Sequence, residues 1–336
     1  MNRFILILSG LLLGLMTWNA CGNKTKPEIK TGINDTLTGL HNLDLLIEEN
    51  PNDPENYFAR AQYHFQAENP MSAVADCQKA ISLDSTKANY YILLGDLNFI
   101  LRKMEETKIC FKKAIDLEPD NVEALMKFGE FKLYLQDYDS MFLFVNRALR
   151  NDQYNSKGYF LKGIAYAEMG DTNSAVSSLQ TCVEIDPEYF NAYMLLGTIF
   201  TAKRNPVSIS YYQNAIDINP TKPEAYYGLA YYFQENGNPR GAINTYQSML
   251  KVSPDNPSAL HNIGYVYLFE LNEKDSAIIY FDKAIRKDVR YLNAIYHRGY
   301  AYELKGNKVA AKTDYEAVLR MDENYRLAQS GLKRVK

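Results

Sequence analysis

The sequence has few of the residues that build disulfide scaffolds, zinc sites and nucleic-acid-binding surfaces. Its 336 residues include four Cys, four His and one Trp. Four scattered Cys are too few for a disulfide framework, and no two of them form the Cys-x-x-Cys pair of a structural zinc site. The net charge is −3, so the chain lacks the basic excess typical of nucleic-acid-binding proteins. These shortages exclude several classes of protein but indicate no activity.

Long hydrophobic runs are also missing, except near the N-terminus. Residues 4–16 are apolar and follow Arg3, a run of signal-peptide length that is too short to span a bilayer. Ala20 and Cys21 come next. This order resembles a bacterial lipoprotein signal, in which the Cys after the cleavage point receives the lipid. The resemblance implies a signal peptide over residues 1–20 and an anchor of several acyl chains on Cys21. An ordinary secretory signal with a chance Cys is the alternative.

The segment after this Cys is polar. Residues 21–37 contain Gly, Pro and Lys without an apolar pattern, which predicts a lipidated Cys followed by a flexible tether. Gly22, and not Asp, follows Cys21. In bacteria that sort lipoproteins by this residue, such a signal leads to the outer membrane. The predicted location is therefore the bacterial cell envelope, lipid-anchored at the outer membrane.

The remainder of the chain is one repeat. Segments such as Ala-Ile-Asp-Leu-Glu-Pro at 114–119 recur at a spacing close to 34 residues. The fifth block is one residue short and the seventh one residue long, and both changes fall in the turn between the two helices of the block. The predicted blocks are 54–87, 88–121, 122–155, 156–189, 190–222, 223–256, 257–291 and 292–325, with caps at 38–53 and 326–336. In the closing helix we expect Leu327, Leu332 and Val335 to point inward.

Positions within the block explain how it folds. Positions 4, 7, 8 and 11 form one face of a first helix, and a small residue at position 8 lets the second helix approach closely. Gly197 occupies position 8 of the fifth block, and we expect a larger residue there to overpack the helix crossing. Gly170, Gly237 and Gly306 occupy position 15, where a helix ends in a left-handed residue. One block cannot bury its own apolar face, so stacking holds the array together.

The blocks resemble tetratricopeptide repeats. In the second block the matching residues are Tyr91, Leu94, Gly95, Phe111, Ala114 and Pro119. The resemblance implies an all-α fold, a tetratricopeptide repeat (TPR) α-solenoid, over residues 38–336. It implies a right-handed superhelix of about eight helix–turn–helix repeats with capping helices. The resemblance is specific for the fold but indicates almost nothing about the function.

Catalytic motifs are absent from the sequence. There is no His-Glu-x-x-His, Gly-x-Ser-x-Gly or phosphate-binding loop, so we expect no enzymatic activity and no cofactor. His261 and His297 could form a metal pair, but no third ligand accompanies them. Cys77, Cys110 and Cys182 occupy packing positions and are expected to be buried. The sequence leaves open whether Cys77 and Cys110 form a disulfide.

A candidate binding surface lies on the first helices of the last three blocks. Positions 5 and 9 should face the concave groove of the solenoid, where no packing role is required of them. Five Tyr and one His fill these positions, and Tyr offers a rigid ring with a polar tip, as in peptide-binding surfaces. In the alternative interpretation the rings pack between blocks. We call this set the tyrosine row: Tyr227, Tyr231, His261, Tyr265, Tyr296 and Tyr300.

These features predict a membrane-anchored scaffold or adaptor that binds a protein or peptide segment of an envelope complex, with no nucleic-acid partner. Secretion, pilus assembly, outer-membrane biogenesis and regulation of a wall enzyme are candidate processes. The groove pairs carry no Lys or Arg, which disfavours the carboxylate clamp of chaperone-binding relatives. Capture of a glycan on the tyrosine row is the alternative function. If the row is not the site, Met126 and Glu130 of the third block are the next candidates.

Overall fold

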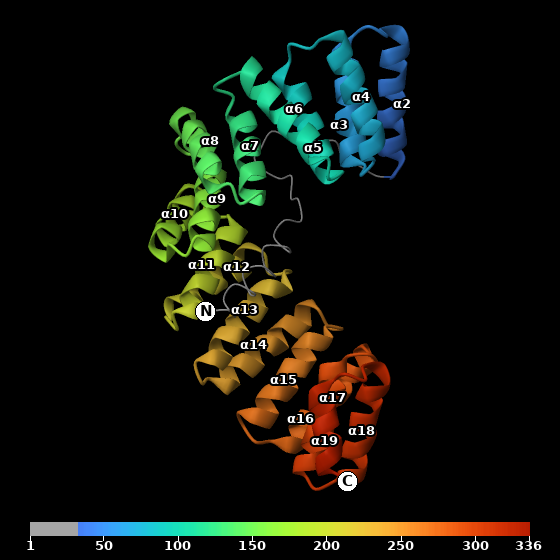
Figure 1. Ribbon diagram of the computed structural model, residues 1–336, viewed down its shortest axis with the longest axis vertical. Coiled ribbons are helices and arrows are strands. Elements are labelled where there is room, and N and C mark those ends of the chain that lie inside the picture. Colours follow the sequence, from blue (N-terminus) through green and yellow to red (C-terminus); the bar gives the residue numbers. More distant parts are fainter. Residues whose placement is uncertain (1–32) are drawn as a thin grey trace. The chain divides into compact units, whose positions relative to one another are not determined.

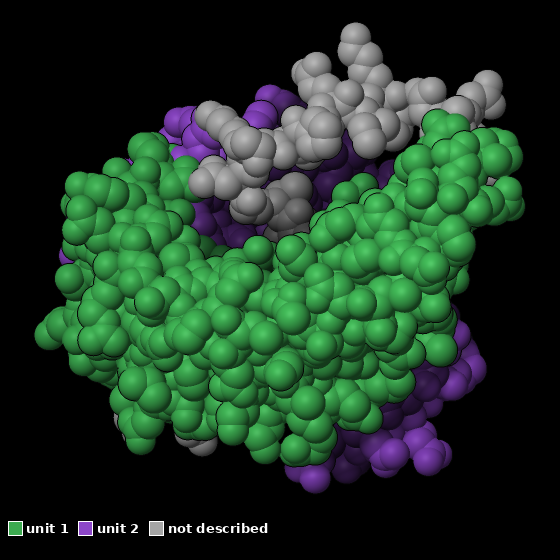
Figure 2. Space-filling view, turned by 90° about the horizontal axis from the view of Figure 1, so that it is seen from above, with its two compact units in different colours: residues 1–187 green, residues 188–336 purple. Residues whose placement is uncertain are grey.

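The computed structural model describes residues 33–336, which form helices joined by short turns and contain no strand (Figure 1). The predictions for the signal peptide and Cys21 lie outside these residues. The chain divides at residue 187 into two compact units, coloured separately in Figure 2, whereas the repeat spacing itself shows no break there. In the first unit the helices are α2 Ile33–Glu49, α3 Pro54–Gln66, α4 Pro70–Leu83, α5 Ala88–Ile100, α6 Met104–Leu117, α7 Val122–Tyr134, α8 Tyr138–Asn151, α9 Ser156–Glu168 and α10 Thr172–Ile185.

The second unit has the same organisation. Each first helix packs against the second helix of its own block, and α13 to α18 continue this pattern one after another. The helices of this unit are α11 Phe190–Ala202, α12 Val207–Ile218, α13 Pro223–Glu235, α14 Pro239–Val252, α15 Pro257–Phe269, α16 Lys274–Lys287, α17 Leu292–Leu304, α18 Lys308–Met321 and α19 Arg326–Arg334. The predicted all-α architecture of repeated helix–turn–helix units is confirmed.

Every full block turns through a left-handed residue after its first helix. Gly170, Gly237 and Gly306 have φ values of 82°, 69° and 80°, as their position predicts. The other five blocks place a residue other than Gly in this conformation, and Gln136 with φ 56° is one example. In that turn the amide of Asp137 donates to the carbonyl of Lys132, which closes the helix end. Five turns therefore keep backbone strain that glycine would relieve.

The glycine at position 8 makes the predicted close contact. A Cβ atom added to Gly197 would lie 2.7 Å from Cε1 of Tyr212, which comes from the second helix of the same block. Gly228 of the next block approaches the same edge of that ring, and its added Cβ would lie 2.4 Å from Cε1. Tyr212 is 3% exposed. One ring thus fills the space left by two glycines from different blocks.

The first and the last full block each contain an arginine that binds two carboxylates in the same pattern. Arg60 binds Asp44 at 2.8 Å and Asp76 at 2.7 Å, the residues 16 positions before and after it. Arg298 binds the carboxylates 16 positions before and after it in the same way. Hydrogen bonds to the carboxylates raise the pKa of both guanidinium groups. At each end of the array a charge-assisted pair of bonds joins a terminal block to the helix before it.

Two details of the caps differ from the sequence interpretation. Helix α2 begins at Ile33, so the predicted tether over 21–37 is too long by five residues. No Gly or Pro occurs between Ile33 and Thr38, so nothing in that stretch stops a helix before Gly39. In α19 Leu327, expected to point inward, is 55% exposed, because the small residues Ala328 and Gly331 form the face that packs on α18.

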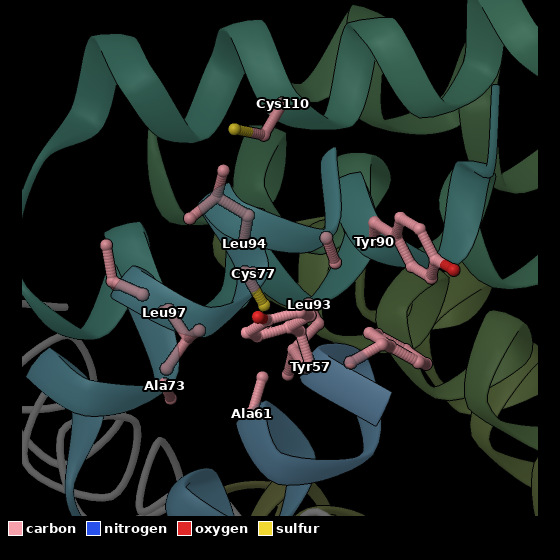
Figure 3. Packing of buried hydrophobic residues seen from close by; sticks show 12 residues of the cluster. Tyr57, Ala61, Ala73, Cys77, Tyr90, Leu93, Leu94, Leu97 and Cys110 are labelled. Atoms are coloured by element: carbon pink, nitrogen blue, oxygen red, sulfur yellow. The ribbon is translucent and has the colours of Figure 1, made fainter. Parts of the chain in front are cut away.

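Three cysteines lie in the described core as free thiols. Cys77 of α4 and Cys110 of α6 belong to one hydrophobic cluster, and Leu94 of α5 lies between them in Figure 3. Burial raises the pKa of the Cys77 thiol to about 12 and that of Cys110 to about 11. Burial also raises the pKa of Cys182 to about 12. Among residues 33–336 no helix is long and apolar enough to cross a bilayer.

Candidate functional site

The tyrosine row lies on three first helices of the second unit, α13, α15 and α17. Tyr227 is 42% exposed, while Tyr231, Tyr265 and Tyr300 are partly buried. His261 and Tyr296 are buried, at 7% and 8% exposed. The expectation that no member has a packing role is therefore wrong for these two. Both stand at position 5, where rings such as Tyr291 and Tyr325, the last residues of their own blocks, cover them.

The structure brings four members of the row into one group of rings, together with two residues that the sequence interpretation did not assign to the row. We call this group the aromatic cluster: His261, Tyr265, Phe269, Tyr296, His297 and Tyr300. Phe269 lies 4.4 Å from Tyr265 and 5.9 Å from Tyr300 between ring centroids, and it joins α15 to α17. Phe269 follows Tyr265 by four residues, so the helical spacing that selected positions 5 and 9 could have found it at position 13.

The two histidines of the cluster form a hydrogen-bonded pair. Nε2 of His261 lies 2.9 Å from Nδ1 of His297, and Nδ1 of His261 lies 3.1 Å from the side-chain oxygen of Asn262. The Asn262 amide donates to the hydroxyl of Tyr246 at 3.4 Å, and that hydroxyl meets the side-chain oxygen of Gln234 at 3.4 Å. A polar chain therefore runs through the rings from α17 to α13.

Burial disfavours the charged form of both imidazoles. It lowers the pKa of His261, and burial together with the neighbouring His261 lowers the pKa of His297 to about 3. The rings of Tyr265, Phe281 and Tyr296 surround the pair, and they offer no counter-ion for a charged imidazole. Within residues 33–336 no group of three His, Cys, Asp or Glu side chains could hold a metal ion.

Tyr227 and Tyr231 lie near Tyr246. The Tyr227 and Tyr246 ring centroids are 6.1 Å apart. Burial raises the pKa of Tyr246, and the nearby Tyr227 hydroxyl, Glu270 carboxylate and Tyr231 hydroxyl raise it further. Burial also raises the pKa of Glu270, although its carboxylate accepts a hydrogen bond from Gln234. These groups place a carboxylate beside the exposed end of the tyrosine row.

A guanidinium lies at the other end of the tyrosine row, beside Tyr300. Arg334 of α19 donates to both carboxylate oxygens of Glu303, at 2.6 Å and 2.9 Å. Its guanidinium carbon lies 5.9 Å from the centroid of the Tyr300 ring. The hydroxyl of Tyr315 donates to the same carboxylate at 2.5 Å. Sequence reasoning missed this contact because it joins the last repeat to the closing helix, outside the repeat pattern.

The alternative position in the third block is occupied by internal contacts. Met126 is buried at 4% exposed and packs close to Gly158 of the next block. The Glu130 carboxylate accepts a hydrogen bond from Lys157 at 2.7 Å. Beside it, Lys127 donates to the buried Asp96 at 2.6 Å, and burial raises the pKa of Asp96 to about 6. The groove positions of the third block therefore carry a buried methionine and an ion-paired carboxylate, and no exposed aromatic ring.

The family models that match this chain match its repeats. A tetratricopeptide repeat family model matches residues 88–121, 156–189 and 292–325, and a second model of the same description matches 227–290. Tetratricopeptide repeat protein 37 of Xenopus laevis is 24% identical over 211 residues, which are 60% of this chain and 14% of that protein. The chain spans between 12% and 25% of the length of the first curated relatives it matches.

Solved structures agree on the fold. The C-terminal part of a TPR repeat-containing protein from Cytophaga hutchinsonii is 18% identical, with a TM-score of 0.62 over 72% of this chain and 99% of that one. PilW, described as a type IV pilus biogenesis factor, is 15% identical with a TM-score of 0.55, over 60% of this chain and 94% of that one. At these identities the likeness concerns the fold alone. With eight helical hairpins in the part that the structure describes and with matching family models, the chain belongs to the tetratricopeptide repeat family.

Proposed function

We propose that this chain is a lipid-anchored scaffold of the bacterial envelope, without catalytic activity, that binds a protein partner through the tyrosine row. The observation that carries the proposal is the exposure of large rings on successive first helices of one unit. Tyr227 and Phe269 are 42% and 44% exposed, and the partly buried rings of Tyr231, Tyr265 and Tyr300 accompany them. Exposed rings grouped in this way are typical of interaction sites. Repeat arrays present such extended surfaces to protein partners.

The partner is a segment of another envelope protein, in an assembly for secretion, pilus formation, outer-membrane biogenesis or wall-enzyme control. The signal-like residues 4–21 support the envelope location, and Cys21 supports the lipid anchor. Replacing Cys21 with Ala should leave the protein unprocessed or release it into the soluble periplasmic fraction. Labelling with a radioactive fatty acid and membrane fractionation measure this. A Cys21→Ala protein that is still lipidated and membrane-bound contradicts the anchor.

The binding surface is tested with Tyr227, the most exposed ring of the row, and with Phe269, the exposed ring that packs against Tyr265 and Tyr300 of the row. The double change Tyr227→Ala with Phe269→Ala should abolish capture of the partner from detergent-solubilised envelopes, because central aromatic side chains can act as hot spots worth about 2 kcal/mol or more. The helical circular dichroism and the melting temperature should change little, since both side chains are partly in solvent.

Tyr154 provides the matched control, because this ring is 71% exposed and lies in the first unit. Tyr154→Ala should leave partner capture unchanged. A folded double variant that still captures its partner excludes the tyrosine row as the site. Release of the bound partner by free sugars, and not by peptides, would favour glycan capture instead.

A further inference from the structure

One end of the tyrosine row already holds a guanidinium. The Arg334 side chain lies over the Tyr300 ring and makes two hydrogen bonds to the Glu303 carboxylate, which Tyr315 also supports. A planar cation between a ring face and a carboxylate combines a cation–π contact with a charge-assisted bidentate pair. In the second unit, therefore, a first helix already binds a basic side chain with an aromatic ring and a carboxylate.

The same arrangement recurs at the exposed end of the row without a cation. Gln234 stands at the position of α13 that Glu303 occupies in α17, and it meets the hydroxyl of Tyr246 as Glu303 meets that of Tyr315. Gln234 in turn donates to the Glu270 carboxylate. Here the carboxylate is supplied by the end of α15, one block further along.

We call this part of the surface the acidic tyrosine site: Tyr227, Tyr231, Glu235 and Glu270. Burial raises the pKa of Glu270, and the like charge of Glu235 raises it further. Within residues 33–336 no Lys or Arg forms an ion pair with either carboxylate. A partly desolvated carboxylate with a like charge near it, beside the exposed ring of Tyr227, favours a cation from outside the described chain.

The first helices of this unit carry a single cation, and it is already paired. In the first helices α11, α13, α15 and α17, Arg298 is the one Lys or Arg residue. Its guanidinium is occupied by Asp282 at 2.5 Å and Asp314 at 2.6 Å. The surface thus presents ring faces and carboxylates, which is complementary to a basic segment and repels an acidic one.

We propose that the acidic tyrosine site binds a Lys- or Arg-containing segment of the partner protein, with the cation held by the rings of Tyr227 or Tyr231 and the carboxylates of Glu235 and Glu270. This inference rests on the proposed function, because it names the chemistry of the segment that the tyrosine row binds. The contact repeats the one that Arg334 makes with Tyr300 and Glu303.

Synthetic peptides test this chemistry directly. The probe is a fluorescein-labelled nonapeptide with Arg and Ala in alternation, and its matched control carries citrulline in place of every Arg. Fluorescence anisotropy with the full chain should show that the Arg peptide binds at least about tenfold more tightly than the citrulline peptide, since citrulline keeps the shape and removes the charge. Glu270→Gln should weaken binding of the Arg peptide about tenfold, the loss expected for one charged hydrogen bond.

Glu184→Gln is the matched control, because Glu184 is exposed on α10 of the first unit and the variant changes the net charge equally. Equal weakening by Glu184→Gln and Glu270→Gln, or equal binding of the Arg and citrulline peptides, overturns the proposal. Capture of the partner distinguishes failure of this proposal from failure of the proposed function. If Tyr227→Ala with Phe269→Ala abolishes capture while Glu270→Gln leaves both capture and Arg-peptide binding intact, the row is the site but the basic segment is wrong. If the ring variant leaves capture intact, the proposed function itself fails.

Discussion

The contact between Gly197 and Tyr212 allows a quantitative test of how tightly the repeats pack. Replacing Gly197 with Ala adds one methyl group whose carbon would lie 2.7 Å from Cε1 and 2.9 Å from Cδ1 of the Tyr212 ring. Real Cβ atoms do not approach other atoms this closely, so the ring has to move. It has little room, because Gly228 of the next block approaches the same ring edge and the ring is 3% exposed.

Two effects of opposite sign decide the result. In an unobstructed helix, Gly to Ala stabilises by about 0.5–1 kcal/mol, because Gly loses more backbone entropy on folding. Overpacking a well-filled core costs about 1–3 kcal/mol. We therefore expect Gly197→Ala to destabilise the fifth block by about 0.5–2 kcal/mol. Gly39→Ala in α2 is the matched control, since its nearest atom would lie at 3.4 Å, and it should stabilise.

Native-state hydrogen exchange is the suitable assay, because a repeat array loses stability locally first. Exchange should rise in α11 and α12 before it rises in α17 to α19. In a Tyr212→Ala background the ring is gone, so Gly197→Ala should become neutral or stabilising, with a coupling energy of about 1–3 kcal/mol between the two sites. A stabilising Gly197→Ala in the presence of Tyr212, or a zero coupling energy, would refute this reasoning.

Three further predictions concern charge and backbone strain. Lys127→Met alone should destabilise by about 3–5 kcal/mol in urea unfolding, because it leaves the buried Asp96 carboxylate without its cation. Adding Asp96→Leu should recover most of that loss. Equal losses of stability in the single and the double variant would contradict this prediction. Gln136→Gly should stabilise by about 0.5–1 kcal/mol because it relieves a φ of 56°, and a lower urea midpoint would contradict it. The pKa of His297 is lowered to about 3 in the folded protein. The free energy of unfolding is therefore highest above the unfolded-state pKa near 6.5, and it decreases as the pH drops through about 6 and 5. This loss, about 2 kcal/mol at pH 5, should be absent in His297→Phe, and parallel pH profiles of the two proteins would contradict the assignment.

Features set by spacing within one block could be predicted from the sequence. Position 8 requires a small residue because the large side chain of the facing second helix fills that space, as Phe111 does at Gly95 and Phe281 at Gly264. The helical hairpins and three left-handed glycines follow from the same local spacing. The other left-handed turns could not be found in this way, because a residue such as Gln136 carries no signal for that conformation.

Contacts made by residues outside the matched positions could not be predicted from the repeat pattern. Position 5 faces the groove, yet His261 and Tyr296 are buried there because neighbouring rings such as Tyr291 and Tyr325 cover them. Those covering residues lie just before α17 and α19, where the pattern assigns no role. The charge on the row also depends on Glu270, which lies just past the end of α15.

The buried thiols make Cys21 separately observable. A thiol with a pKa of about 11 or 12 is almost entirely protonated at pH 7, and only the thiolate reacts with a maleimide. Cys77, Cys110 and Cys182 are buried as well, so they stay unlabelled while the protein is folded. Cys21 is the one other cysteine in the sequence. Native maleimide labelling therefore reports the chemical state of a single sulfur atom, and denaturation adds three more as an internal standard.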